Sequence, residues 1–398
     1  MIPGFIGRTP VYDRSLNLFA YQLLPCSLPE TTGVPLEPFL QQIWENVRLD
    51  QLTGGKTGLI SLPGPLLEGL TELPMPKDKL IVNVPRQLLS DAVLDVIKQL
   101  DNQGYVLAIS TDCYDETLAN KTDYAELWSF DASCSTAELQ PHLDELHAKG
   151  IKVLLRQIET QQQYDKAFDA GFDYFQGRYF ERPRLIHGTQ MPANKLTALQ
   201  LIARLQDPKI TIEEVEDLVS CDISLSYKLL RLINAAFYGL PKKVDSIRRA
   251  VVFFGLNRIK HWATVVLVNA IDYKPRELMI TALVRARTCE YIAEQQGNLN
   301  SEECYICGLF SLLDAIMDAP MAEILKHMSL TDDINEALVF GGGPLGPVLQ
   351  TTLSLEQGVC QRLPLETLNL EDTMRAFVGA IEWAEQVRLQ LQQEPPPE

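Results

Sequence analysis

Short apolar runs alternate with amphipathic stretches in the first half of the chain. Runs of this length, bounded by turn residues, are typical of buried strands. Several of the stretches between them have helical spacing and end in glycine, which closes helices in the left-handed conformation. Continuous apolar strands separated by helices predict a parallel sheet covered on both faces, here a TIM-like α/β (β/α) barrel. The expected strands are residues 16–24, 57–62, 79–84, 105–110, 126–131, 151–157 and 173–177.

The strand pattern stops near residue 191, and helical spacing continues almost to the C terminus. Thr211 and Glu214 form a capping box, in which each side chain satisfies a backbone donor of the first helical turn. The segment PRLIHGTQMPANK fits neither pattern, and the last residues read EPPPE. We therefore expect a barrel over 1–187, an all-α helical domain over 188–392 and a disordered tail over 393–398.

The composition narrows the class of protein. The chain has 398 residues, 46% of them hydrophobic, and a formal net charge of -17. Such a charge disfavours nucleic acid and anionic membranes as partners of the whole protein. No apolar run approaches the roughly 18 residues of a membrane span, and no signal peptide is evident. The eight cysteines are scattered, including Cys304 and Cys307, which lack a second pair for zinc. These features predict reduced thiols and a cytoplasmic location.

Four segments together resemble a known two-domain architecture. FIGRTPVYDRSLNLFAYQLL (5–24) and GFDYFQGRYFERP (171–183) resemble the first and last strands of an EAL domain, the barrel of cyclic-di-GMP phosphodiesterases. The stretch 222–260, DISLSYKLLRLINAAFYGLPKKVDSIRRAVVFFGLNRIK, resembles the core of an HDOD domain. CGLFSLLDAIMDAP (307–320) resembles the HDOD variant that follows EAL barrels in bacterial signalling proteins. The resemblance implies an EAL-type barrel followed by an HDOD-type helical domain.

EAL domains hydrolyse their phosphodiester with two divalent cations, which need charged oxygen ligands. The matching positions in this chain carry no carboxylate, and Arg156 adds a positive charge. Two like unit charges about 4 Å apart repel by about 4 kcal/mol at an effective dielectric constant near 20. We therefore predict no metal, no cofactor and no catalysis, and so a pseudoenzyme. The vestigial active-site positions are Gln22, Cys26, Ser61, Asn83, Ser110, Thr111, Ser129 and Arg156, with Gln176 the one family residue retained.

Alternatives to this prediction stay open. Asp112, Asp115 and Asp131 are acids that a different metal site would use. In the helical half, Phe310 and Ser311 stand where related metallohydrolases carry a histidine motif. No complete P-loop, nucleophile elbow or dinucleotide fingerprint is present.

The leading functional hypothesis is a non-catalytic bacterial signalling scaffold that acts through protein partners and for which cyclic-di-GMP binding is disfavoured. One alternative is a metal-independent sensor that holds a nucleotide or another anion at the barrel mouth through Arg156, Gln176 and Arg178. The least favoured hypothesis is that the chain retains residual cyclic-di-GMP phosphodiesterase activity. Dimerisation through the barrel also remains open from the resemblance.

One region reverses the sign of the overall charge. Basic residues gather between 228 and 261, where Asp245 is the one acid. Charged residues are ordinary on helix surfaces, and bases near helix C-termini complement the dipole, so the pattern has a plain structural explanation. It also predicts a partner surface for an acidic protein or a nucleotide phosphate. Its residues are Lys228, Lys242, Lys243, Arg248, Arg249, Arg258 and Lys260.

Overall fold

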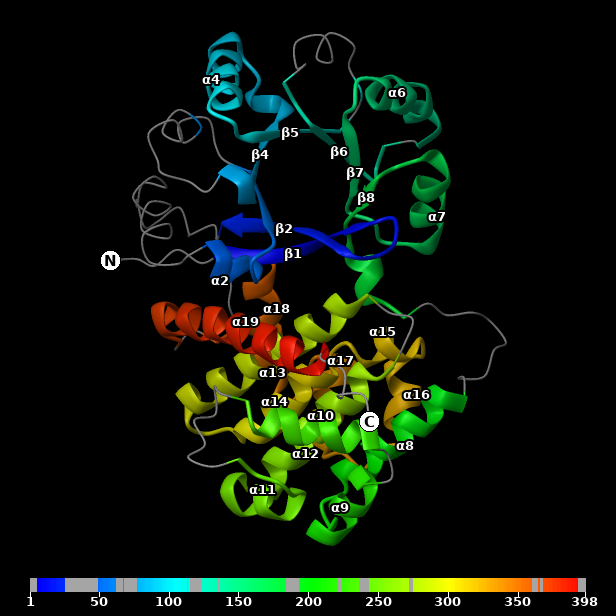
Figure 1. The fold of residues 1–398 in the computed structure, drawn as a ribbon, viewed down its shortest axis with the longest axis vertical. Coiled ribbons are helices and arrows are strands. Elements are labelled where there is room, and N and C mark those ends of the chain that lie inside the picture. The colour runs from blue at the N-terminus through cyan, green and yellow to red at the C-terminus, as the bar shows by residue number, and fades with distance from the viewer. Residues whose placement is uncertain are drawn as a thin grey trace. The chain divides into compact units, whose positions relative to one another are not determined.

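A computed structural model of the chain divides into two compact units (Figure 1). The barrel unit contains residues 1–181 and 354–362, and the helical unit contains 182–353 and 363–398. The predicted domain boundary at 187 and the disordered tail stay predictions. The structure describes residues 6–25, 49–61, 67, 77–112, 114, 124–134, 136–183, 193–220, 223–235, 243–271, 275–359, 364–365 and 368–392.

The barrel unit contains a closed barrel with the strand order β1-β2-β3-β4-β5-β6-β7-β8. Strands β2 to β8 pair in parallel, as the apolar runs predict. The strands are β1 (Ile6–Asp13), β2 (Leu18–Pro25), β3 (Thr57–Ser61), β4 (Leu80–Pro85), β5 (Val106–Thr111), β6 (Leu127–Asp131), β7 (Lys152–Arg156) and β8 (Tyr174–Phe175).

Strand β1 departs from the predicted parallel sheet. It runs antiparallel to β2 and to β8, and it closes the barrel between them. The sequence did not reveal it, because IGRTPVYD has no continuous apolar run and contains Pro10, which cannot donate to a strand ladder. The prediction of a wholly parallel sheet was therefore wrong at this strand.

Successive side chains of a strand point to opposite faces, so the barrel unit has one apolar core inside the barrel and another on its outer wall. Val11, Ala20, Leu59, Ala108 and Leu154 belong to a cluster inside the barrel. A second cluster on the outer wall includes Trp128, Phe130 and Phe175 and is covered by helices that follow the strands. The helices described in this unit are α2 (Leu49–Thr53), α4 (Asp91–Asn102), α6 (Thr136–Ala148) and α7 (Gln161–Ala170).

The helical unit is built around α13, which is buried along most of its length and packs against α14 and α19. None of the described helices is both long and apolar enough to cross a membrane. The cytoplasmic location stays a prediction. The helices are α8 (Ala193–Gln206), α9 (Ile212–Ser220), α10 (Ile223–Ile233), α11 (Ile247–Phe254), α12 (Leu256–Asn269), α13 (Arg276–Gln296), α14 (Ser301–Phe310), α15 (Leu313–Met317), α16 (Met321–Leu325), α17 (Asp332–Phe340), α18 (Gly346–Glu356) and α19 (Leu370–Gln392).

The barrel unit includes a segment that is remote in sequence, residues 354–362. Its backbone lies against the β1–β2 hairpin so closely that a Cβ on Gly7 would lie 2.4 Å from the carbonyl oxygen of Glu356. A Cβ on Gly358 would lie 2.9 Å from the Cβ of Leu24. Glycine at both positions therefore permits this contact.

The packing of α13 against α14 depends on Gly308. A Cβ there would lie 2.6 Å from the Arg285 carbonyl oxygen and 2.7 Å from the Ala286 nitrogen. Because these are backbone atoms, Gly308→Ala should force the helices apart and lower the free energy of unfolding by about 1–3 kcal/mol. Gly379→Ala on α19 is the control, since its Cβ would meet nothing within 4 Å; it should add about 0.5–1 kcal/mol. Urea unfolding followed by circular dichroism measures both, and equal effects would contradict the packing role.

A second prediction concerns Asp173, which joins α6, β7 and β8. Its carboxylate accepts bonds from Lys152 Nζ at 2.9 Å, His147 Nε2 at 2.9 Å and the Val153 nitrogen at 3.0 Å. Burial alone would raise the pKa of Asp173, but the bonds outweigh it and hold the pKa below its ordinary value of 3.8. The bonds therefore stabilise the fold above about pH 4, and this contribution is lost as the pH falls through the lowered pKa.

Asp173→Asn should lower the free energy of unfolding by about 1–3 kcal/mol at pH 7, because the charged acceptor is lost. The difference from wild type should shrink below pH 4. Asp95→Asn is the control, since Asp95 forms one exposed ion pair with Lys98; its effect should be about 0.5 kcal/mol or less. A pH-independent loss in the Asp173 variant would contradict the charge-based explanation.

Candidate functional site

The mouth of the barrel is lined by one polar side chain from each of β1 to β7 and by Gln176, the residue that follows β8. In β2 to β8 each of these residues lies two positions after a residue of the interior apolar cluster or one packed against it, so alternation directs it to the same face. Thr9 has the equivalent place in the antiparallel β1, two positions before Val11. We call this set the mouth layer; it comprises Thr9, Gln22, Ser61, Asn83, Ser110, Ser129, Arg156 and Gln176.

Asn83 links three neighbouring strands of the mouth layer. Its Nδ2 donates to Ser61 Oγ at 2.7 Å and to Ser110 Oγ at 3.0 Å. Asn83 is buried, and its Oδ1 has no hydrogen-bond partner among the described residues. A buried acceptor of this kind normally has a partner. The trio is therefore a neutral network whose one unpaired acceptor, among the described residues, is buried.

Arg156 is the one charged member of the mouth layer. It ends β7, in register with Asp131 at the end of β6. Burial lowers the pKa of the Arg156 guanidinium, and the carboxylates of Asp131 and Asp112 counteract part of that shift. Its Nε has no hydrogen-bond partner among the described residues. Arginine stays charged in proteins, so the layer carries a partly buried positive charge at neutral pH.

A cavity of about 310 Å³ opens where β1, β2, β7 and β8 meet the mouth. Gln22, Gln176 and Arg178 line it, so the structure brings these three predicted residues together. Gln176 Nε2 donates to Thr9 Oγ1 at 2.6 Å, which fixes its amide across the β1–β8 junction. Thr9, Gln157, Glu159 and Glu181 also line the cavity, and sequence reasoning missed all four.

The loops around this cavity are held tightly. The Ile158 nitrogen donates to the Gln176 carbonyl, and the Tyr179 nitrogen donates to the Ile158 carbonyl. A Cβ on Gly177 would lie 2.2 Å from the Ile158 carbonyl oxygen. Gln157 has φ 58°, a left-handed conformation that costs energy in a residue other than glycine. The packing of the two loops against each other holds this conformation in place.

Other predicted positions lie elsewhere. Cys26 and Asp115 are outside the described residues. Thr111 is buried on the outer face of β5, because it is one residue beyond Ser110. Among the residues that the structure describes, no three His, Cys, Asp or Glu side chains are placed to hold a metal ion. In the helical unit, Phe310 is buried in the core, and Ser311 Oγ donates to the Gly308 carbonyl at 2.7 Å.

The predicted basic surface loses one member to burial and has others that are paired with acids. Lys260 is buried and donates to the Asp207 carbonyl at 3.3 Å, so its assignment to a partner surface was wrong. Arg248 pairs with Glu213 and Glu216 of α9. Spatial neighbours therefore neutralise charges that look unopposed along the sequence. The remaining members are Arg258, which lies 3.7 Å from Glu290 on α13, half-buried Lys228, exposed Lys243 and Arg249, and Lys242, which is outside the described residues.

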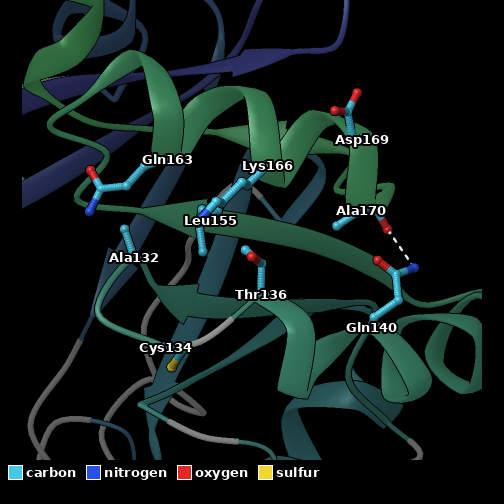
Figure 2. A pocket seen from close by; sticks show the side chains of 9 residues that line it. All are labelled: Ala132, Cys134, Thr136, Gln140, Leu155, Gln163, Lys166, Asp169 and Ala170. Carbon is cyan, nitrogen blue, oxygen red and sulfur yellow. Dashed lines mark hydrogen bonds between the residues drawn. The ribbon is translucent and has the colours of Figure 1, made fainter.

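Figure 2 shows a second hollow, of about 690 Å³, on the outer wall of the barrel unit. Leu155 of β7 lies between side chains of α6 and α7, and Gln140 Nε2 donates to the Ala170 carbonyl at 3.1 Å. Lys166 and Asp169 give the lining opposite charges. The hollow therefore has no preference for one sign of ligand charge.

Comparison with known proteins finds a family match within the helical unit. Residues 191–329 match the HDOD domain family. The chain is 25% identical over 405 residues to the uncharacterised protein YuxH of Bacillus subtilis, covering 95% of this chain and 97% of YuxH. It is 26% identical over 409 residues to the cyclic di-GMP phosphodiesterase CdgJ of Vibrio cholerae, covering 97% of this chain and 94% of CdgJ.

Solved structures with partial likeness are EAL proteins. The FimX EAL domain of Pseudomonas aeruginosa bound to c-di-GMP is 16% identical, covers 44% of this chain and 89% of its own, and has a TM-score of 0.36. The PaMucR phosphodiesterase in complex with c-di-GMP is 17% identical, covers 49% of this chain and 100% of its own, and has a TM-score of 0.36.

The prediction that this chain is not an enzyme is contradicted by the relative CdgJ, which is a named phosphodiesterase similar over almost the entire chain. The prediction counted carboxylates at the aligned strand ends and, as an alternative metal site, Asp112, Asp115 and Asp131. The cavity brings in Glu159 and Glu181 from loops after β7 and β8, which that count left out. The chain is thus similar to the HDOD domain family over residues 191–329 and, over nearly its full length, to a cyclic di-GMP phosphodiesterase.

Proposed function

We propose that this chain is a bacterial signalling protein whose barrel mouth binds cyclic di-GMP through its phosphodiester groups. The observation that carries the proposal is the single charge of the mouth layer, which is positive and partly buried beside a cavity that Arg178 also lines. This departs from the expectation, drawn from sequence, that cyclic-di-GMP binding is disfavoured. The name of the relative CdgJ supports the same ligand.

The chemistry of the lining matches a phosphodiester. Phosphate oxygens are acceptors and carry negative charge, so they need N–H and O–H donors. In the cavity, Arg178 supplies charged donors, and the amides of Gln22 and Gln176 and the hydroxyl of Thr9 supply neutral ones. Arg156 adds a positive charge at the end of β7, outside the lining of the cavity. The acceptors at the mouth, Glu159 and Glu181, suit the N–H groups of a guanine base.

The loops that cross at Ile158 and Gly177 preorganise the proposed binding site. Because the Ile158 backbone bonds to both sides of Gly177, the residues that follow β7 and β8 have little freedom to rearrange. A site that is already ordered loses less conformational entropy when a ligand binds. The proposed site is therefore expected to bind with Arg178 and Gln176 close to their present positions.

Arg156→Met and Arg178→Met should each weaken binding of cyclic di-GMP to the full chain. A charge-assisted hydrogen bond contributes about 1.5–3 kcal/mol, which corresponds to about 10- to 100-fold in Kd. Isothermal titration calorimetry measures the affinity, with and without Mg²⁺ or Mn²⁺. Chromatography of the same samples detects any linear dinucleotide product, and turnover should fall in the same two variants.

Lys166→Met is the matched control, because Lys166 lines the outer hollow and not the mouth cavity. It should leave both affinity and turnover unchanged. The proposal fails if the wild-type chain shows no binding at millimolar cyclic di-GMP. It also fails if the Lys166 variant loses as much affinity as the mouth variants.

A further inference from the structure

Strands β3, β4 and β5 bring a neutral set of side chains to the barrel mouth. Ser61 ends β3 in register with Asn83 of β4, and Ser110 lies near the end of β5. The resemblance of the barrel to EAL phosphodiesterases implies two divalent cations here, so their fit to these residues can be tested. Mg²⁺ and Mn²⁺ prefer several oxygen ligands, including charged carboxylates. Hydroxyls and an amide supply no charge to offset the loss of the hydration shell of the ion.

Hydrogen bonds within the set also oppose a cation. Asn83 Nδ2 donates to Ser61 Oγ at 2.7 Å and to Ser110 Oγ at 3.0 Å, so its hydrogens point at the oxygens that a metal would need. One uncharged amide oxygen is left, whereas Mg²⁺ takes about six oxygen ligands. If the amide were turned by 180°, its oxygen would be used by the two hydroxyls and its N–H groups would point away from them. In both orientations the amide hydrogens repel a cation.

Burial fixes this arrangement. Asn83 is 1% exposed and Ser110 is 6% exposed, so neither has solvent-filled space in which to turn toward an ion. Within the described ranges of the chain, no group of three His, Cys, Asp or Glu side chains is placed to supply the missing ligands. The residues at the mouth therefore do not fit the two divalent cations that the resemblance implies.

The same layer contains a positive charge of its own. Arg156 ends β7, and its guanidinium stays protonated at neutral pH. Burial lowers its pKa, and Asp131 and Asp112 reverse part of that shift only. Arg287 of the helical unit is the opposite case, because its ion pair with Glu290 raises its pKa in spite of burial. The acids near Arg156 therefore do not balance its charge as Glu290 balances that of Arg287.

Asp131 has a structural role of its own. It is in register with Arg156, but its Oδ1 accepts a hydrogen bond from the Ser133 nitrogen at 3.1 Å and so supports the turn after β6. A single carboxylate beside a guanidinium is also a poor ligand for a divalent cation, because the ion and the arginine repel each other. The guanidinium is thus suited to an anion that comes from outside the fold.

We propose that the Arg156 guanidinium takes the place of divalent cations at the barrel mouth, so that a phosphodiester ligand binds there without metal. This role rests on the proposed binding of cyclic di-GMP and concerns binding, not hydrolysis. A phosphodiester group has one negative charge, which one guanidinium balances through charge-assisted hydrogen bonds. A metal ion would place a second cation beside the arginine and would weaken this match.

Titration calorimetry of the full chain with cyclic di-GMP tests the role in three buffers, which contain EDTA, Mg²⁺ or Mn²⁺. We expect the three Kd values to agree within about twofold. Arg156→Gln should raise Kd at least tenfold in every buffer, because glutamine keeps hydrogen-bond donors but has no charge. Melting temperatures verify that the variant is folded, and chromatography verifies that the ligand is intact.

Lys56→Gln is the matched control, because it removes the same charge at the other end of the barrel. Lys56 is exposed and precedes β3, whereas Ser61 ends that strand at the mouth. Its Kd should equal that of the wild type. Arg156→Glu supplies a carboxylate in place of the guanidinium. Its affinity should fall at least tenfold, and Mg²⁺ or Mn²⁺ should not restore it, because Ser61, Asn83 and Ser110 stay neutral.

Four results would overturn this role for Arg156. They are binding that needs Mg²⁺ or Mn²⁺ and disappears in EDTA, wild-type affinity in Arg156→Gln, recovery of Arg156→Glu by a metal, and an equal loss in Lys56→Gln. The outcome for the proposed function is distinct. Absence of binding in all three buffers would contradict the cyclic di-GMP site itself, and the role of Arg156 would fall with it.

Discussion

The register of the closed barrel is the constraint on which the candidate site depends. Each strand is locked to two neighbours, so no strand can slip by one residue without turning its interior side chains outward. The interior apolar cluster fixes which residues face inward, and the polar residues two positions further along must then meet at the mouth. Packing of residues such as Leu59 and Ala108 thus positions Ser61 and Ser110, although the apolar residues contact no ligand.

The same geometry explains the chemical character of the mouth. Strand ends supply amides, hydroxyls and one guanidinium, whereas carboxylates enter from the loops at Glu159 and Glu181. Arg178, in the segment after β8, adds a second guanidinium to the donors of the strand ends. The close crossing of Gly177 and Ile158 holds these loops beside Thr9, Gln22 and Gln176 of the mouth layer, so donors and acceptors share one cavity.

The sequence was sufficient to predict features that depend on a local pattern of residues. It was insufficient to predict features that depend on packing between distant segments. Apolar runs located β2 to β8, and the aligned positions identified seven of the eight mouth-layer residues. Pro10 concealed β1, and with it Thr9, because that strand is recognisable by its partners and not by its own residues. The loop residues of the cavity have no periodicity to identify them. Counting acids along the chain also failed to predict the local charge of the basic region between 228 and 261, because Glu213 and Glu216 reach Arg248 from another helix.

The two units differ in the kind of surface that they present to other molecules. The barrel mouth is recessed, and its polar groups are held by strands whose apolar layer is fully packed, so small ligands with matching donors and acceptors suit it. Helix α11 is the reverse: it packs against α9 and α12 and pairs with α9 through Arg248, while Val252 and Phe253 stay exposed. The polar groups of the mouth and the packing of α11 therefore depend on separate residues, and substitution at either leaves the framework of the other intact.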